Sequence, residues 1–234
     1  SYFDNMNSLV ANIYSVLPVD FGRVSDAMME SATDNSVYTW ENNSIYYLTN
    51  GTWSPLKRVD DGWAFWTGIR SANSFLENYD SEVLKRFEYN EDYADMMAKA
   101  SKFSYEVRFL RAFYLFELAK RYGDIPLVTR TYTQEEINSI EKTPFVEVID
   151  YIAKECSEIA LELPADQSEV RNETGRVTKG AALALKSRAL LYAASALHNP
   201  DNDLTRWEAA AKAAYEVIAM GKYQLPKITA DGRT

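Results

Sequence analysis

Histidine and cysteine are almost absent from this sequence, which has one of each among its 234 residues. A single cysteine cannot form a disulfide within the chain, and Cys156 lies on an apolar helical stripe that favours a place in the core. The only histidine, His198, follows the end of an expected helix, where histidine commonly interacts with the helix dipole. No nucleophile elbow, Walker loop or HExxH motif is present. The sequence therefore predicts no catalytic residue, no metal site and no cofactor.

Clusters of basic residues and long apolar runs are also missing. The net charge is −9 without a Lys/Arg cluster, which argues against a nucleic-acid partner because neutralising phosphates requires a concentrated basic surface. An anionic ligand is disfavoured for the same reason. No apolar run approaches the roughly 20 residues that span a bilayer. No signal peptide is recognisable, since residues 1–4 lead directly into a helical pattern.

Aromatic residues, in contrast, are abundant, with 16 Tyr, 10 Phe and 5 Trp. This supply exceeds what the core of a chain of this length normally needs. Aromatic rings provide flat platforms for apolar ligands and for the rings of sugars. The alternative is that the bulky Tyr and Phe side chains fill the cores between packed helices.

The strongest helical pattern begins near Tyr93 and stops at Gly123. Its second half carries two apolar faces about a third of a turn apart. The residues on these faces are Phe103, Val107, Leu110, Tyr114 and Leu118 on one, and Phe109, Phe113 and Phe116 on the other. A helix that is apolar on two faces belongs in the centre of a domain. Gly123 suits the left-handed position after a helix, and Pro126 prevents the helix from continuing.

Two segments carry a family resemblance. Residues 109–127 contain the strings FLRA and RYGDIPL, and residues 175–192 contain GRVTKGAA followed by LLY. Both are similar to signature segments of the SusD/RagB family of bacterial nutrient-binding outer-membrane lipoproteins, and they occur in the same order. Residues 63–73 resemble a third segment of that family less closely. Members of the family are much longer, so the resemblance covers the N-terminal half of such a protein, and we expect the C-terminal half to be absent.

The resemblance implies a function and a cellular place. Proteins of this family face the exterior on the outer membrane, where they capture a glycan or other nutrient oligomer and deliver it to a TonB-dependent (SusC-like) transporter. It therefore implies a non-catalytic cell-surface binding protein with an oligosaccharide and that transporter as partners. It also implies that the membrane is contacted only through a lipid anchor, and we expect the anchor cysteine and a secretion signal to precede residue 1.

The remaining pattern predicts further helices separated by irregular polar segments. Thr143 and Thr178 are expected to be N-caps, and Thr205 to Glu208 reads as a capping box that opens the last helix. The expected helices, apart from the central one, are 3–17, 62–78, 144–163, 178–198 and 205–220. The expected loops are 18–60, 79–92 and 164–177.

Paired helices with alanine at their crossing points resemble tetratricopeptide repeats. The pairs would lie at about 93–162 and 178–221, and they begin roughly 85 residues apart rather than the 34 of a regular repeat. We therefore predict an all-α fold, a tetratricopeptide-like helical repeat scaffold with irregular loop insertions. It would form a single domain over residues 1–234, with 18–60 as a loop insertion.

The insertion supplies the candidate ligand-binding residues. Sugar rings stack on Trp and Tyr, and their hydroxyl groups pair with Asp and Asn side chains. The predicted stacking residues are Trp40, Tyr46, Tyr47 and Trp53, and the predicted hydrogen-bonding residues are Asp34 and Asn43, with Asn42 and Asn50 beside them. The alternative is that these aromatic side chains pin the loop onto the helices.

Other polar groups have simpler explanations. Asp201, Asn202 and Asp203 weakly suggest calcium, but the glycine and distal Glu of an EF-hand are absent. Asp60 and Asp61 are adjacent, whereas a glycosidase needs separated carboxylates that face one cleft. Two alternatives to a glycan receptor stay open at this point, namely a tetratricopeptide-type protein–protein interaction adaptor and a glycan-active hydrolase.

Overall fold

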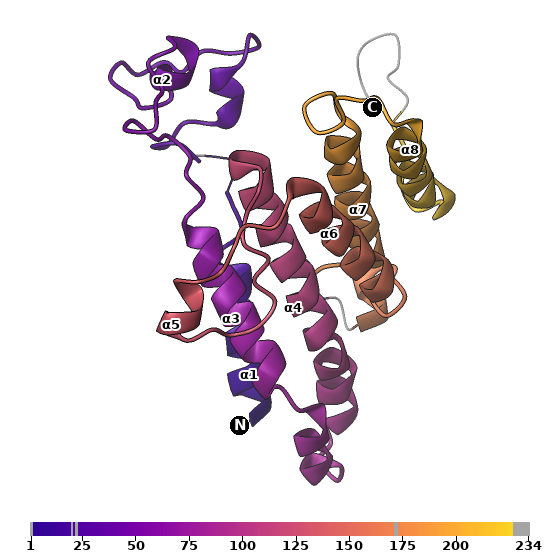
Figure 1. Cartoon of the computed structure of the whole chain (residues 1–234). Coiled ribbons are helices and arrows are strands. Elements are labelled where there is room, and N and C mark those ends of the chain that lie inside the picture. The colour runs from indigo at the N-terminus through magenta and orange to yellow at the C-terminus, as the bar shows by residue number, and fades with distance from the viewer. Residues whose placement is uncertain (1, 20, 22, 171–172, 227–234) are drawn as a thin grey trace.

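The computed structural model describes residues 2–19, 21, 23–170 and 173–226, and the regular elements within them are helices joined by irregular segments (Figure 1). The all-α prediction is confirmed. The α-helices are α1 (Tyr2–Tyr14), α2 (Tyr46–Thr49), α3 (Ala64–Asn78), α4 (Tyr93–Tyr122), α5 (Gln134–Ile137), α6 (Phe145–Ile159), α7 (Lys179–Ala194) and α8 (Leu204–Ala219). Short 3-10 helices lie at η1 (Met29–Ala32), η2 (Ser81–Phe87) and η3 (Gln167–Val170). Within these ranges, no helix has both the length and the apolar character needed to cross a membrane.

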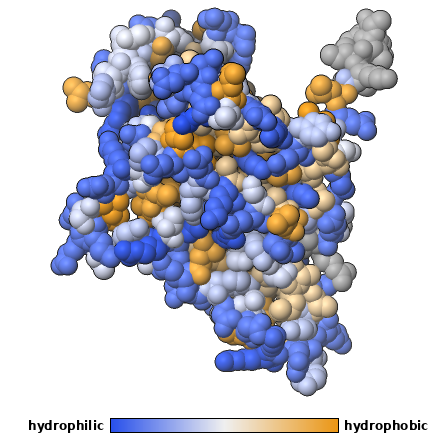
Figure 2. All heavy atoms as spheres, turned by 45° about the vertical axis from the view of Figure 1, so that its right-hand side comes forward, coloured by the Kyte–Doolittle hydropathy of each residue, from blue (hydrophilic) through white to orange (hydrophobic). Residues whose placement is uncertain are grey.

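From α3 onward, the long helices pack against one another in the order in which they occur in the sequence. α3 packs on α4, α4 on α6, α6 on α7 and α7 on α8, while α1 covers α3 and α4 from the other side (Figure 1). This arrangement of successive neighbours is consistent with the predicted tetratricopeptide-like scaffold. α8 ends the stack, and only Ala210 and Ala213 of this helix are buried. Figure 2 brings this side of the molecule forward and shows apolar side chains at the surface among hydrophilic ones.

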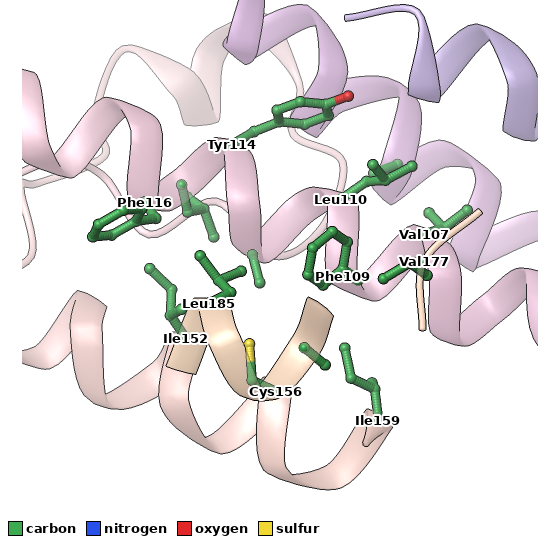
Figure 3. Close-up of a cluster of buried hydrophobic side chains, with 14 of the residues drawn as sticks. Val107, Phe109, Leu110, Tyr114, Phe116, Ile152, Cys156, Ile159, Val177 and Leu185 are labelled. Carbon is green, nitrogen blue, oxygen red and sulfur yellow. The ribbon is translucent and has the colours of Figure 1, made fainter. Parts of the chain in front are cut away.

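The core is built around α4, as its two apolar faces predicted. Phe103, Leu110, Tyr114 and Phe116 are fully buried in this helix. Figure 3 shows one side of α4 facing Ile152, Cys156 and Ile159 of α6, with Leu185 of α7 beside them. Burying such side chains stabilises the fold by roughly 1.5–3 kcal/mol each. We call the packed helices α1, α3, α4, α6, α7 and α8 the bundle.

The start of α6 differs from the prediction. Thr143 is not its N-cap, because α6 begins at Phe145 and Pro144 therefore occupies the N-cap position. Pro144 makes no side-chain capping hydrogen bond. The Thr143 backbone pairs with Ile125 instead, with its N–H 2.9 Å from the Ile125 carbonyl oxygen. Asp124 supplies a hydrogen-bond acceptor at the start of α6, since its Oδ1 accepts from the Phe145 N–H at 2.8 Å. The cap thus comes from the far side of the connection, which local sequence spacing does not reveal.

Of the other two predicted caps, one is confirmed and one is wrong. Thr178 is the N-cap of α7 and accepts a hydrogen bond from the Ala181 N–H, as predicted. The prediction of a capping box that starts at Thr205 is wrong, because α8 begins one residue before Thr205 and Asp203 is its N-cap. The Asp203 carboxylate accepts from both the N–H and the hydroxyl of Thr205. An aspartate two residues before a threonine caps as well as the threonine does, so the sequence alone does not separate the two.

Several expected boundaries shift by a few residues. α1 ends at Tyr14 rather than 17, α6 at Ile159 and α7 at Ala194. The loops expected at 79–92 and 164–177 contain η2 and η3, which are too short to show a helical period. Residues 171–172 of the second loop lie outside the described part of the chain.

Candidate functional site

The segment between α1 and α3 forms a small separate body. We call residues 23–61 the lobe. In Figure 1 it projects beyond the end of α4 at which that helix stops. The lobe has a core of its own, in which Val24, Ala27 and Ile45 are buried. Irregular structure was predicted here, and most of the lobe is irregular, apart from the single turns η1 and α2. Residues 20 and 22 of the predicted insertion are outside the described residues.

Side-chain hydrogen bonds hold the lobe together. The Asn43 side chain donates to the Ser25 carbonyl at 2.6 Å and accepts from the Ile45 N–H at 2.9 Å. The hydroxyls of Ser25 and Ser44 lie 2.7 Å apart. Ser25 and its neighbour Asp26 adopt positive φ angles of 48° and 69°, a conformation that costs energy for residues with a side chain. These polar contacts therefore fix a turn that would not form by local preference.

An ion-pair cluster attaches the lobe to α4. Arg23 lies 3.2 Å from Asp60 and 3.3 Å from Glu117 of α4, and Arg121 lies 2.5 Å from Asp60 and 2.7 Å from Glu117. Burial alone would raise the pKa of Glu117, but hydrogen bonds from Lys120 and Arg121 outweigh it and hold the pKa below its usual range. Glu117 is therefore a buried carboxylate that stays charged and pairs with Arg23 of the lobe, while Arg121 of α4 pairs with Asp60 at the other end of the lobe.

A cavity of ≈ 390 Å³ that is open to solvent lies on the surface of the lobe. Its lining residues are Glu41, Asn42, Asn43, Tyr46, Tyr47 and Asn50. Two aromatic rings stand among three amides and one carboxylate. Such a mixture offers apolar faces with a few polar groups that fix orientation, which is the usual composition of a small-ligand site. The set suits a neutral ligand with ring faces and hydroxyl groups.

The two tyrosines have different surroundings. The Tyr46 hydroxyl donates to the Tyr38 carbonyl, and the Tyr46 ring packs on the small core. Tyr46 therefore supports the lobe from within, whereas the alternative considered for these aromatic residues was that they pin the loop onto the helices. Tyr47 is 37% exposed, and the Lys57 ammonium lies 5.2 Å from the centre of its ring. Tyr47 is thus the more exposed of the two tyrosines, and Lys57 lies over its ring.

The remaining predicted residues lie outside this cavity lining. Trp40 and Trp53 are 72% and 61% exposed, and the Trp40 ring stands edge-on to Tyr38 with centroids 6.2 Å apart. Asp34 is exposed on the turn that follows η1. The structure therefore brings Asn43, Tyr46 and Tyr47 together and leaves Asp34, Trp40 and Trp53 on the surrounding surface. Their contact with a ligand stays a prediction.

Sequence reasoning did not single out Glu41 or Lys57. Glu41 directly follows Trp40, and acidic residues beside aromatic ones were not weighed in this segment. Lys57 reaches Tyr47 from ten positions further along the chain. No spacing rule predicts that contact, because it depends on how the lobe folds back on itself.

The minor candidates have structural partners. The His198 ring stacks on Phe145 with centroids 3.6 Å apart, and burial lowers the pKa of His198. Asp203 caps α8, and Asp60 is paired with arginines. Burial raises the pKa of Cys156 to about 12, so its thiol stays protonated. Among the residues that the structure describes, no three His, Cys, Asp or Glu side chains are grouped to hold a metal ion.

The chain matches a family of known description. The model of a SusD-like family, described as starch-binding and associating with the outer membrane, matches residues 3–191. Among solved structures, a SusD-like protein from Bacteroides fragilis is 25% identical, with a TM-score of 0.67 over 97% of this chain and 40% of that chain. No curated protein sequence matches.

Two further solved structures show the same fold. A SusD-like carbohydrate-binding protein from Bacteroides fragilis is 23% identical, with a TM-score of 0.70 over 95% of this chain and 41% of that chain. A laminarin-binding SusD-like protein is 22% identical, with a TM-score of 0.66 over 92% of this chain and 43% of that chain. The chain therefore spans less than half the length of each of these relatives.

Proposed function

The chain belongs to the SusD-like family, and from that premise we propose that it is a non-catalytic binding protein that captures a neutral oligosaccharide in the lobe. The observation that carries this proposal is the lobe cavity, in which the partly exposed ring of Tyr47 stands among the amides of Asn42, Asn43 and Asn50. Two of the solved relatives are themselves described as carbohydrate-binding and laminarin-binding.

Binding would rest on stacking and hydrogen bonds. A pyranose ring lies with its apolar face on Tyr47, while its hydroxyl groups exchange hydrogen bonds with the amides around the ring. Glu41 accepts hydrogen bonds from hydroxyl groups and repels an anionic sugar, in keeping with the net charge of −9. No covalent step is needed, so the ligand leaves as it arrived.

The cellular part of the proposal follows from the family. The protein would lie on the outer-membrane surface and pass its ligand to a TonB-dependent, SusC-like transporter. A lipid anchor would be its attachment to the membrane. The family's association with the outer membrane supports this placement.

Affinity electrophoresis tests the proposal. Native gels that contain soluble starch, laminarin, xylan or mannan should retard the chain in at least one case. Tyr47→Ala should weaken that retardation by about fivefold to tenfold, because it removes the stacking surface. Tyr215→Ala is the matched control, since Tyr215 is 67% exposed on α8 and far from the lobe in sequence.

Unchanged migration of the wild-type chain in all four gels would contradict the proposal. If the chain then bound peptides, the tetratricopeptide-type adaptor would replace it. Release of reducing ends from a polysaccharide by the purified chain would instead favour the hydrolase.

A further inference from the structure

A second pair of aromatic rings is open to solvent at the base of the lobe. Trp63 directly precedes α3, and Tyr122 is the last residue of α4. Their ring centroids lie 6.2 Å apart at an interplanar angle of 51°, and the two residues are 53% and 45% exposed. Two large aromatic side chains that pack together and still leave half of their surface in water form a platform that the core does not require.

Backbone contacts fix this platform. The Tyr122 hydroxyl donates to the Asp61 carbonyl at 2.7 Å, and the Asp61 carboxylate accepts from the Trp63 N–H at 3.1 Å. Gly62 between them has a φ of 66°, and a Cβ there would lie 3.1 Å from the Arg121 side chain and 3.0 Å from Phe65. Only glycine fits this turn without displacing a neighbour. The rings are therefore held in place before any ligand arrives.

Trp63 also lines a cavity of ≈ 410 Å³ that shares no residue with the first cavity. Its apolar wall includes Val16, Pro18, Val19 and Val59. Its polar groups belong to Arg23, Asp60 and Asp61. Arg23 and Asp60 are joined in an ion pair, so they offer lone pairs and N–H groups without a free charge between them. This cavity again combines a ring, apolar surface and a few fixed polar groups.

We infer that this cavity and the Trp63–Tyr122 platform form a second saccharide-binding site, which takes a pyranose ring of a neutral oligosaccharide. The ligand class rests on the proposed function. The two aspartates disfavour an anionic ligand, and the tilted rings supply stacking faces for a sugar.

The two cavities lie close together along the chain. Lys57 contacts Tyr47 of the first cavity, and Val59 lines the second. Two residues span at most about 7 Å of extended chain. We therefore expect an oligosaccharide long enough to reach both cavities to bind more tightly than a shorter one.

Fluorine NMR of the chain labelled with 5-fluorotryptophan tests the inference. The sequence has five tryptophans, and single Trp→Phe variants assign their resonances. Maltoheptaose and laminarihexaose serve as the α-linked and β-linked probes. We expect the Trp63 resonance to shift on addition of at least one probe, while the Trp207 resonance on α8 stays in place. A Trp63 resonance that both probes leave unmoved would overturn the inference.

The variants separate this inference from the proposed function. Trp63→Ala should weaken binding of the seven-residue or six-residue probe by about fivefold to tenfold, with Trp207→Ala as control. Tyr122→Ala, which removes the second ring of the platform and its hydrogen bond to the Asp61 carbonyl but keeps Trp63, should give the same loss if Trp63→Ala fails to fold. Binding that needs Tyr47 but is indifferent to both variants would overturn the second site and leave the first intact. Loss with both variants, without loss of folding, supports the inference.

Discussion

The bundle and the lobe are held together in different ways. The bundle has one continuous apolar core that runs from α1 to α7, with α4 at its centre. The lobe buries three apolar residues, Val24, Ala27 and Ile45, and depends on hydrogen bonds and ion pairs for the rest. The comparison teaches that the apolar core lies in one part of the chain and the proposed binding surface in another. The lobe is free to vary its surface because the bundle does not need it for its core.

The aromatic residues follow the same division. Phe103, Tyr114 and Phe116 of the bundle are fully buried, whereas Trp40 and Trp53 of the lobe are largely exposed. The surplus of aromatic residues therefore has two uses. In the centre of the bundle it fills space between helices, whereas in the lobe, at its base and on α8, where Trp207 and Tyr215 are exposed, it provides surfaces in contact with solvent.

The largest effect should come from a cavity in the bundle. Leu110→Ala removes a fully buried side chain from the centre of α4 and should lower the free energy of unfolding by about 3 kcal/mol. Ile45→Ala removes a side chain that is equally buried in the lobe. It should leave urea unfolding of the bundle, followed by far-UV circular dichroism, nearly unchanged. Equal losses for the two variants would mean that the lobe and the bundle share one core, which would break the comparison.

A smaller effect should come from the attachment between the two regions. Glu117→Gln keeps the size of the side chain, and Arg23 and Arg121 keep Asp60 as a charged partner, so we expect a loss below the roughly 3–5 kcal/mol that breaking a buried pair costs. We expect faster amide hydrogen exchange in the lobe and little change at the centre of α4. Uniformly faster exchange in both regions would show instead that Glu117 supports the bundle core.

The pH dependence of this attachment supplies a check. The pKa of Glu117 is lowered in the folded chain from an ordinary value of 4.5, so its stabilising contribution is complete above that value and is lost as the pH falls through the lowered pKa. The protection of lobe amides, measured as the ratio of the intrinsic to the observed exchange rate at each pH, should therefore fall below a pH of about 4.5 in the wild-type chain. In Glu117→Gln this acid dependence should be weaker. An equal dependence in both chains would assign it to other groups.

The bundle was predictable from the sequence because its signals are local. Two apolar faces on one helix place α4 in the centre whatever surrounds it, and Gly123 ends it. The exact caps were less predictable, since Asp203 and Thr205 both suit the start of α8 and only the packed chain decides between them.

The candidate site was predictable only in part. The mixture of aromatic and amide residues predicted a ligand surface at residues 34–55, but which of them line a cavity depends on contacts between distant positions. Asn43 reaches back to Ser25, and Lys57 reaches back to Tyr47. Trp63 and Tyr122 come from two different helices. No pattern of spacing within one segment could have paired them.

Amide hydrogen exchange with and without a bound glycan tests the division of roles most directly. The ligand is the polysaccharide that retards the chain best in the native gels. Our account predicts slower exchange in residues 41–50 and unchanged exchange in α7 and α8. Slower exchange in α7 and α8, with the lobe unaffected, would contradict it and place recognition on the bundle.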